Sequence, residues 1–195
     1  VNQAAGAARG DYLLLLNNDA VPRAGSLRNA VDTLESAADI AAVGGRLILP
    51  DGQLQEAGSI IWTDGRCLGY GRGLPERSYE AMFRRDVDFC SAAFLLVKRI
   101  IFEALGGFDE AFSPAYSEET DLCLRIHERG MRVVYEPRAV IDHFEFASSV
   151  QRAEAIAQQE KNIRLLKSKH EALLRAHLPA DTKNIFRARA RSAIK

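Results

Sequence analysis

One apolar run that ends abruptly in polar residues constrains the fold of this chain more than any other feature. Residues 12–16 read Tyr-Leu-Leu-Leu-Leu, and Asn17, Asn18 and Asp19 follow them directly. Such a run, bounded by turn formers, is typical of a strand buried on both faces, as in a parallel sheet covered by helices. Pro22 then prevents a simple continuation of the hydrogen-bonded ladder. We therefore expect a central strand whose carboxyl end presents the three polar side chains.

Two interpretations of this polar triplet remain open from the stretch alone. Ligands of open α/β sheets bind at the carboxyl ends of strands. The carboxylate of Asp19 and the amide of Asn17 would suit a divalent cation such as Mg²⁺ or Mn²⁺ that also holds phosphate oxygens. Asn and Asp are also common turn formers. The triplet is therefore either part of a ligand site or a plain turn.

Length and composition indicate a globular protein with one substantial core. The chain has 195 residues, of which 47% are hydrophobic, and no apolar run approaches the ~20 residues of a membrane span. The first residues lack the basic and apolar regions of a signal peptide. The three cysteines, Cys67, Cys90 and Cys123, have no metal-ligand spacing. Reduced thiols in a cytoplasmic protein are therefore expected.

A net charge of zero hides a basic C-terminal segment. Between Lys161 and Lys195 there are ten basic and two acidic residues. A segment of this kind can bind an anionic membrane surface or nucleic acid, or can form a solvated helix face. We expect no nucleic-acid partner, and leave open a peripheral contact with the inner face of the membrane.

The rest of the sequence predicts alternating strands and helices. Ser26 and Ser117 are good N-cap candidates, and Pro137 is expected to end a strand. The glycines after a predicted turn at Asp64-Gly65 suggest a mobile loop. The expected strands are 40–49, 87–99 and 131–137, the expected hairpin is 57–73, and the expected helices are 26–37, 99–105, 117–129 and 149–176, with a helix or a frayed end at the C-terminus.

The helix predicted at 117–129 begins with an unusual concentration of acid. Glu118, Glu119 and Asp121 occupy its first turn, where the helix dipole stabilises negative charge. A carboxylate held rigidly at a helix start can also act as a general base. His143 follows the last predicted strand and is either a metal or phosphate contact or a structural histidine.

Taken in order, these segments resemble a family 2 glycosyltransferase with the GT-A fold over roughly residues 2–149. The blocks that carry the resemblance read "NQAAGAARGDYLLLLNNDAVP", "PDGQLQEAG", "FCSAAFLLVKRIIFEALGGFDEAF" and "SEETDLCLRIHERGMRVVYEPRAVIDH". They are similar to the branch that adds rhamnose and related sugars to bacterial surface polysaccharides. The resemblance implies an α/β, Rossmann-like, doubly wound mixed sheet that lacks the N-terminal part of the family's domain. Residues 1–149 would be the C-terminal two-thirds of a GT-A domain, and 150–195 a basic helical extension.

The resemblance also implies roles for individual residues. The family's metal-binding acidic motif falls on Asn17, Asn18 and Asp19, with Asp19 as a ligand of the metal that carries the donor diphosphate. The histidine after the last strand of the family's domain falls on His143, a second metal contact.

The family's catalytic acidic motif falls on the acidic helix start. Glu119 stands at the position of the general base, where the family usually has Asp. Asp121 or Glu118 would orient the acceptor.

The implied reaction is inverting transfer of a single sugar from a nucleotide-diphosphate sugar to a saccharide or lipid-linked acceptor. The Gln-x-x-Arg-Trp motif of the processive members is absent, which favours one transfer over polymerisation. An alternative of another class is a non-catalytic module that binds carbohydrate or a partner on the same fold. Because the first part of the family's domain is not in the sequence, the chain alone could be inactive.

Overall fold

The computed structural model describes residues 1–144 and 152–191 and contains a seven-stranded mixed sheet. The order along the sheet is β1-β8-β3-β9-β2, with β4 paired to β3 and β7 to β9. Only β3 and β9 run parallel, and the other pairs are antiparallel. The strands are β1 Tyr12–Leu16, β2 Ala20–Pro22, β3 Ile40–Ile48, β4 Leu54–Ala57, β7 Arg85–Asp86, β8 Phe94–Lys98 and β9 Arg132–His143, and a separate two-stranded sheet holds β5 Ser59–Ile61 and β6 Cys67–Gly69.

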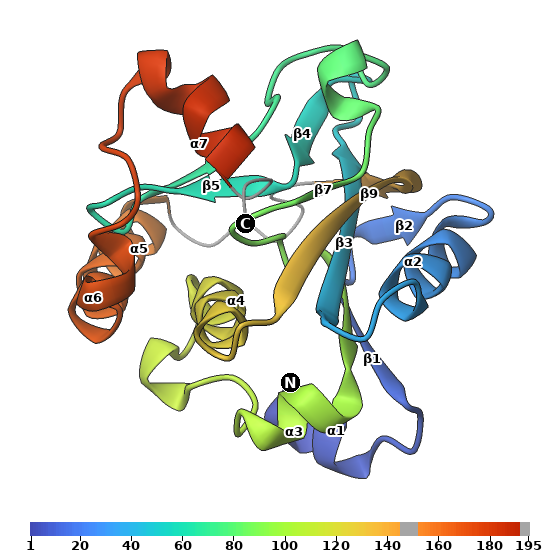
Figure 1. Ribbon diagram of the computed structural model, residues 1–195, viewed down its shortest axis with the longest axis horizontal. Helices are drawn as coiled ribbons and strands as arrows, with labels where there is room; N and C mark the ends of the chain where they lie inside the picture. Colours follow the sequence, from blue (N-terminus) through green and yellow to red (C-terminus); the bar gives the residue numbers. More distant parts are fainter. Residues whose placement is uncertain (145–151, 192–195) are drawn as a thin grey trace.

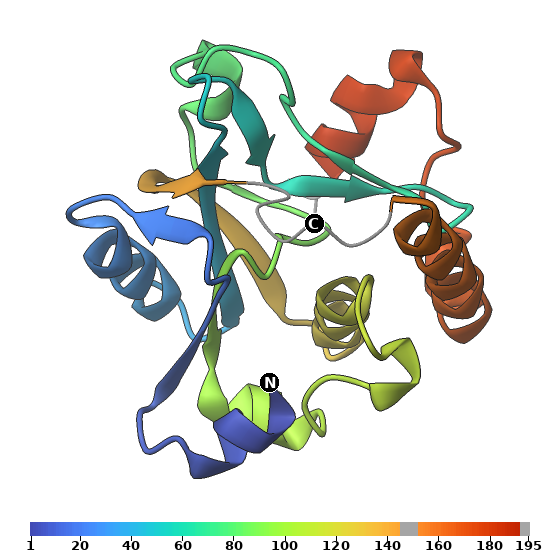
Figure 2. The same ribbon diagram turned by 180° about the vertical axis from the view of Figure 1, so that it is seen from behind.

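Helices cover both faces of the large sheet. One side is covered by α2 (Ser26–Glu35), and the other by α4 (Glu118–Glu128), with α5 (Arg152–Lys169) and α6 (Glu171–Leu174) beyond it (Figure 1, and from behind in Figure 2). Two buried clusters follow from this layering. Leu34 of α2 lies in one, and Leu166 of α5 lies in the other together with Leu122 of α4. The remaining helices are α1 Asn2–Ala7, η1 Tyr79–Ala81, α3 Arg99–Ala104, η2 Glu110–Phe112, η3 Thr182–Asn184 and α7 Ile185–Arg191.

The predicted α/β class is confirmed, but the predicted central position of the first strand is wrong. Within the described part of the chain, β1 lies at the end of the strand order and pairs only with β8. Leu13 and Leu15 are buried, whereas Leu16 is 44% exposed. The burial alternates along the strand, as it does in an antiparallel edge strand with one face on the core. The inference from the unbroken apolar run that both faces of this strand are buried is therefore wrong.

Pro137 does not end the last strand, contrary to expectation. β9 continues to His143 because its pairing with β3 slips at this point: Gly45 pairs with Glu136, and the next residue, Arg46, pairs with Val140. A proline without a backbone N–H is tolerated at such a bulge. The continuation places His143 opposite Ala20 of β2.

Neither predicted N-cap serine caps its helix with its side chain. Gly25, with a φ of 83°, is the N-cap of α2, and the hydroxyl of Ser26 instead donates to the carbonyl of Val140 at 2.8 Å. Ser117 precedes α4 with a φ of 72° and makes no side-chain capping bond. The serine is therefore held in a left-handed backbone conformation that only glycine adopts readily.

The hairpin that turns at Asp64-Gly65 is confirmed as β5 and β6. The stretch that follows, predicted to be mobile, is hydrogen-bonded to the neighbouring strands: the N–H of Tyr70 donates to Gly58, and the carbonyl of Tyr70 accepts from Ala57. The helix predicted at 149–176 is interrupted at His170. Residues 149–151 of that prediction lie outside the described residues.

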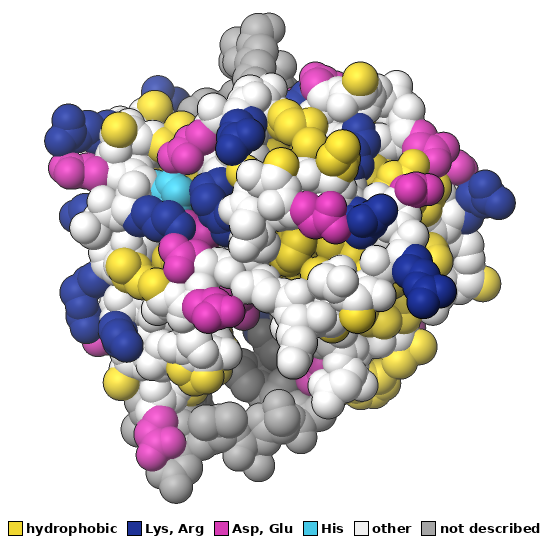
Figure 3. Space-filling view, turned by 90° about the horizontal axis from the view of Figure 1, so that it is seen from below, with side chains coloured by type: hydrophobic (Ala, Val, Ile, Leu, Met, Phe, Trp, Pro, Cys, Tyr) yellow, Lys and Arg dark blue, Asp and Glu magenta, His cyan; other side chains and the backbone are white. Residues whose placement is uncertain are grey.

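The helices of the described residues were compared with the length and hydropathy that a membrane span requires. Within residues 1–144 and 152–191, no helix combines the length and the apolar character needed to cross a membrane. The face shown in Figure 3 carries basic and acidic side chains interspersed with small hydrophobic areas.

Candidate functional site

The β1–β2 turn and the end of β9 bring two predicted metal contacts together. His143 Nε2 lies 3.2 Å from Asp19 Oδ1 and 3.4 Å from Asn17 Nδ2. The pairing of β2 with β9 fixes this arrangement, since the N–H of Phe144 donates to the carbonyl of Asp19 at 2.9 Å. Asn18 lies exposed in the same turn. The polar triplet is thus both a turn and part of a side-chain cluster.

A buried glutamine orients the histidine of this cluster. His143 Nδ1 lies 2.6 Å from Oε1 of Gln55 on β4. A carboxamide oxygen can only accept, so Nδ1 carries the proton and donates to it. When the ring is neutral, Nε2 carries the lone pair and accepts from Nδ2 of Asn17, and this tautomer is assigned from the hydrogen-bond network.

The chemistry of this cluster fits a divalent cation. A carboxylate oxygen and an imidazole nitrogen 3.2 Å apart can both coordinate one ion, and such mixed oxygen and nitrogen ligands suit Mn²⁺. A metal-binding histidine usually donates its other ring N–H to a neighbouring group, as His143 does to Gln55. Within the described ranges, no group of three or more His, Cys, Asp or Glu side chains could hold a metal. The protein would therefore supply two ligands and leave positions for phosphate oxygens and water.

A second acidic centre lies at the start of α4. Glu118 and Glu119 are adjacent and half-buried. Burial, together with the neighbouring negative charges of Glu118 and Glu56, raises the pKa of Glu119 to about 8. Burial also raises the pKa of Glu118, whose Oε2 is buried without a hydrogen-bond partner among the described residues. Both carboxylates therefore hold a proton more tightly than an exposed glutamate does.

The adjacent residues Gln55 and Glu56 connect the two acidic centres through β4. Gln55 contacts His143, as described above, while Glu56 is 7% exposed and raises the pKa of Glu119 through its negative charge. The carboxylate of Glu56 accepts from the hydroxyl of Ser59 and from the N–H of Ser91, each at 2.9 Å. Both residues lie in the "PDGQLQEAG" segment, but nothing in the sequence of that strand reveals that two consecutive polar residues are buried there.

Asp121 lies in a separate cluster of ion pairs. It is fully buried and contacts Arg125 Nε at 2.7 Å, Lys169 Nζ at 2.8 Å and His170 Nε2 at 2.7 Å. Burial alone would raise the pKa of Asp121, but hydrogen bonds from His170 and Lys169 and the charge of Arg125 lower it. Asp121 therefore ties α4 to the end of α5, while Glu118 and Glu119 remain outside this network of cations.

The loop before α4 is held by a residue that sequence reasoning missed. Tyr116 and Ser117 have φ values of 77° and 72°, a conformation that costs energy in residues with side chains. Asn162 of α5 is fully buried. Its Nδ2 lies 2.8 Å from each of three backbone carbonyl oxygens, those of Phe112, Ala115 and Tyr116. Helix α5 thus helps to fix the position from which Glu118 and Glu119 project.

Comparisons with known proteins identify the family and the fold of this chain. The model of the family described as "Glycosyltransferase like family 2" matches residues 1–162. The O-antigen biosynthesis protein RfbC of Myxococcus xanthus is 33% identical over 164 residues, which cover 82% of this chain and 13% of that protein. The protein y4gI of Sinorhizobium fredii is 32% identical over 75% of this chain and 17% of its own length. The chain thus spans less than a fifth of these two relatives.

Solved structures with similar folds include two glycosyltransferases. GalNAc-T7, solved with UDP, GalNAc and Mn²⁺, has a TM-score of 0.61 at 11% identity, covering 98% of this chain and 42% of that chain. The mannosyltransferase PcManGT from Pyrobaculum calidifontis, solved with GDP-Man and Mn²⁺, has a TM-score of 0.55 at 19% identity, covering 97% and 47%. At these identities the similarity shows the fold alone, and that fold is GT-A. Because the family model covers most of the sequence, the chain belongs to the family 2 glycosyltransferases.

Proposed function

We propose that this chain carries the metal-binding and catalytic residues of an inverting glycosyltransferase that acts in bacterial surface polysaccharide synthesis. It would transfer one sugar from a nucleotide-diphosphate sugar to a saccharide or lipid-linked acceptor. The observation that carries the proposal is the pair of acidic centres, Asp19 with His143 and Glu118 with Glu119, connected through β4. Two relatives named "O-antigen biosynthesis protein" and "Rhamnosyltransferase" support the pathway and the type of sugar.

Asp19 and His143 would hold a divalent cation together with the diphosphate of the donor. Mn²⁺ or Mg²⁺ bound there would neutralise the charge that develops on the leaving diphosphate. The protein's own contribution is orientation: Gln55 keeps the proton on Nδ1 of His143, so that Nε2 stays free to coordinate. The Mn²⁺ and nucleotides in the two structural neighbours support this assignment.

Glu119 would act as the general base. Its pKa of about 8 makes it a stronger base than an ordinary glutamate once it is ionised. Glu119 would take the proton of the acceptor hydroxyl while that oxygen attacks the anomeric carbon from the face opposite the diphosphate. The configuration at that carbon is then inverted. Asp121 and Asn162 would position the start of α4 without contacting the substrate.

The basic end of the chain would bring the enzyme to its acceptor at an anionic membrane surface. Lys183 is exposed and available for such a contact. Each basic residue near an anionic surface contributes about 1 kcal/mol. The protein would act on the cytoplasmic side, where nucleotide sugars are made.

The full-length protein tests this function. We expect it to release nucleoside diphosphate from nucleotide sugars in the presence of Mn²⁺ and an acceptor extract, and Asp19→Asn to abolish that release. Product anomers assigned by NMR should show inversion. Donor binding without any turnover would contradict the proposal and favour a non-catalytic binding module on the same fold.

A further inference from the structure

An arginine that is buried without an acidic partner among the described residues lies away from the two acidic centres. Arg85 of β7 is 8% exposed, and its Nε and Nη1 atoms are buried with no hydrogen-bond partner in the described residues. Its Nη2 donates to the carbonyl of Ala57. Removing a guanidinium from water while two of its nitrogens stay unbonded costs several kcal/mol unless a compensating group is present. The protein atoms described here do not supply that group.

Aromatic rings surround this guanidinium but cannot replace a counterion. The Cζ atom of Arg85 lies 4.8 Å from the ring centre of Tyr70, 5.4 Å from that of Phe83 and 4.6 Å from that of Tyr135. Such cation–π contacts offset part of the lost hydration. The rings do not accept hydrogen bonds from the in-plane N–H groups of the guanidinium, and these are the groups that bind oxygen.

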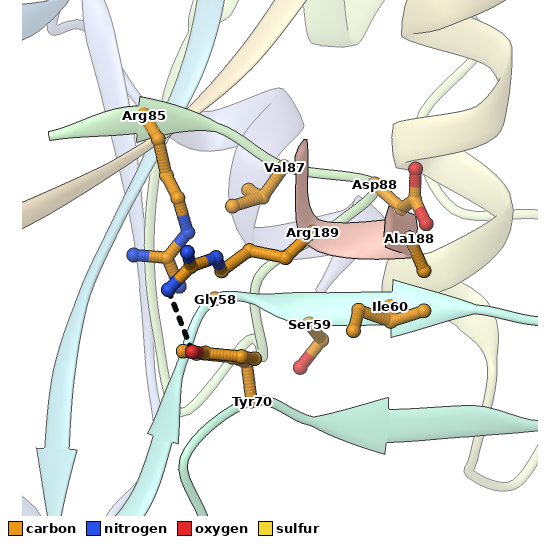
Figure 4. Close-up of a pocket in the computed structure, with 9 residues that line it drawn as sticks. All are labelled: Gly58, Ser59, Ile60, Tyr70, Arg85, Val87, Asp88, Ala188 and Arg189. Carbon is orange, nitrogen blue, oxygen red and sulfur yellow. Dashed lines mark hydrogen bonds between the residues drawn. The ribbon is translucent and has the colours of Figure 1, made fainter. Parts of the chain in front are cut away.

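A second arginine reaches the same place from the far end of the chain. Arg189 of α7 donates from Nη1 to the hydroxyl oxygen of Tyr70 at 2.6 Å, and its Cζ lies 5.0 Å from the centre of the Tyr70 ring. Figure 4 shows Arg85 and Arg189 pointing towards each other above Tyr70, at a cavity also lined by Ser59 and Val87. Burial, together with the charge of Arg189, lowers the pKa of Arg85. Two cations that converge in this way repel each other unless an anion lies between them.

The one acid in the wall of this cavity is engaged elsewhere. Asp88 lines the cavity, but its Oδ2 accepts from the N–H of Ile61 at 2.9 Å and lies 3.7 Å from Nδ1 of His177. The cavity therefore combines two converging guanidinium groups with an acid that faces other partners.

We propose that Arg85 and Arg189 form a binding site for a phosphate-type oxyanion. A tetrahedral oxyanion accepts several hydrogen bonds at once and matches the planar fork of a guanidinium. Its charge would compensate the two cations, and its oxygens would accept hydrogen bonds from the two guanidinium groups. The site shares no residue with the Asp19–His143 cluster, so it is separate from the proposed donor site. A free phosphate or diphosphate and a phospholipid headgroup offer the same chemistry.

Occupation of this site would hold α7 against the domain. Arg189 is the contact from α7 that reaches Tyr70, and Arg187, two residues earlier on the same helix, is exposed. The two arginines therefore form a matched pair for a test. Arg189→Gln removes a charge from the proposed site, while Arg187→Gln removes the same charge from the same helix outside it.

The first test measures binding of inorganic phosphate to the 195-residue chain by calorimetry, with thermal unfolding at low salt as a second readout. We expect phosphate to bind and to raise Tm in the wild type and in Arg187→Gln, and the Kd to weaken at least tenfold in Arg189→Gln. Arg85→Met should also lose the response, while its Tm without phosphate stays the same or rises because an uncompensated buried charge is gone. If Arg85→Met fails to fold, the comparison of Arg189→Gln with Arg187→Gln still tests the proposal.

Two further arms identify the source of the anion and separate the site from the donor site. If the protein floats with phosphatidylglycerol vesicles, and flotation is lost in Arg189→Gln but kept in Arg187→Gln, the site binds a lipid headgroup. If the protein binds phosphate but does not float with the vesicles, the site binds a soluble phosphate. Asp19→Asn should bind phosphate as the wild type does. Equal responses of Arg189→Gln and Arg187→Gln in both arms, or no response of the wild type in either, would overturn the proposal.

Discussion

Nδ1 of His143 lies 2.6 Å from Oε1 of Gln55, so one buried amide determines which nitrogen of the histidine faces Asp19. If His143 binds a metal, Gln55 acts on that metal through the ring. Removing such an outer partner typically weakens metal affinity by about 10- to 100-fold. We expect Gln55→Met, which keeps the length of the side chain, to weaken Mn²⁺ binding by about tenfold in the presence of a nucleoside diphosphate. Gln53→Met, the same change at an exposed position two residues earlier, is the control. Unchanged Mn²⁺ affinity in Gln55→Met would remove the reason to assign His143 as a ligand.

The metal should bind together with the nucleotide and weakly without it. The protein offers one carboxylate and one imidazole at this place, and Mg²⁺ and Mn²⁺ need about six ligands, which phosphate oxygens and waters would complete. Calorimetry should therefore detect little Mn²⁺ binding to the isolated chain alone and clear binding once a nucleoside diphosphate is added. Tight binding of Mn²⁺ in the absence of nucleotide would contradict this account of the cluster.

Glu119 should control the dependence of the transfer rate on pH. Its pKa of about 8 means that only a minority of the free enzyme holds the ionised base at pH 7. We expect kcat/KM of the full-length enzyme to rise with pH and to level off above about 8. Glu119→Gln should lower turnover by roughly 100-fold or more, because an amide cannot take a proton.

A conservative variant separates the role of base from a role in shape. Glu119→Asp restores the residue type usual at this position in the family and keeps a carboxylate, so it should retain a pH-dependent rate. If the Glu119→Gln variant keeps most of the transfer rate, Glu119 is not the base. If Asp121→Asn alone then abolished transfer in a folded protein, Asp121 would take that role.

The same pKa predicts the direction of a stability change. A glutamate has a pKa of about 4.3 in an unfolded chain, and Glu119 has one of about 8 in the folded protein. Between these values the folded state binds more protons than the unfolded state, so the free energy of unfolding falls as pH rises. We expect Glu119→Gln to lose less stability than the wild type between pH 5 and pH 9, measured by urea unfolding. Glu154→Gln, an exposed change on α5, should follow the wild type, and parallel curves for all three proteins would refute the shift.

The elements that the sequence predicted well are those whose signals are local. The strand at residues 12–16, the helix that begins with Glu118 and the hairpin around Asp64-Gly65 each carry their own periodicity or turn residues, and each is present. The prediction that Pro137 ends its strand was wrong because the strand continues through a bulge next to Gly45. That bulge is a property of the pairing of two strands and not of the sequence of one strand. The triplet at residues 17–19 was placed correctly at a strand end.

The parts of the site that escaped prediction depend on contacts between distant segments. The role of Gln55 can be recognised only when β9 places His143 against it. The role of Asn162 can be recognised only when α5 packs against the loop at residues 112–116. Arg85 and Arg189 look like ordinary basic residues until the fold brings both against the ring of Tyr70. The spacing of residues along the sequence does not predict contacts between distant segments, because such contacts form only when the whole chain is folded.

Asp121 provides the last prediction, which concerns stability and not chemistry. It is fully buried, and its two oxygens contact Arg125, Lys169 and His170. Removing one partner from a buried set of ions leaves charges without compensation and typically costs about 3–5 kcal/mol. We therefore expect Asp121→Asn to lower the free energy of unfolding by about 3 kcal/mol or more in urea titrations.

The chain contains a matched control for this variant. Asp32 on α2 pairs with Arg28 across one helical turn, as Asp121 pairs with Arg125, but both Asp32 and Arg28 are exposed and their closest charged atoms are 3.9 Å apart. Exposed pairs contribute about 0–1 kcal/mol, so Asp32→Asn should change stability little. At temperatures where Asp121→Asn is still folded, the pH at which the transfer rate levels off should match that of the wild type, because Glu119 and its neighbours are unchanged. Equal effects of the two substitutions on unfolding would mean that the ion pairs of Asp121 do not join α4 to the C-terminal helices.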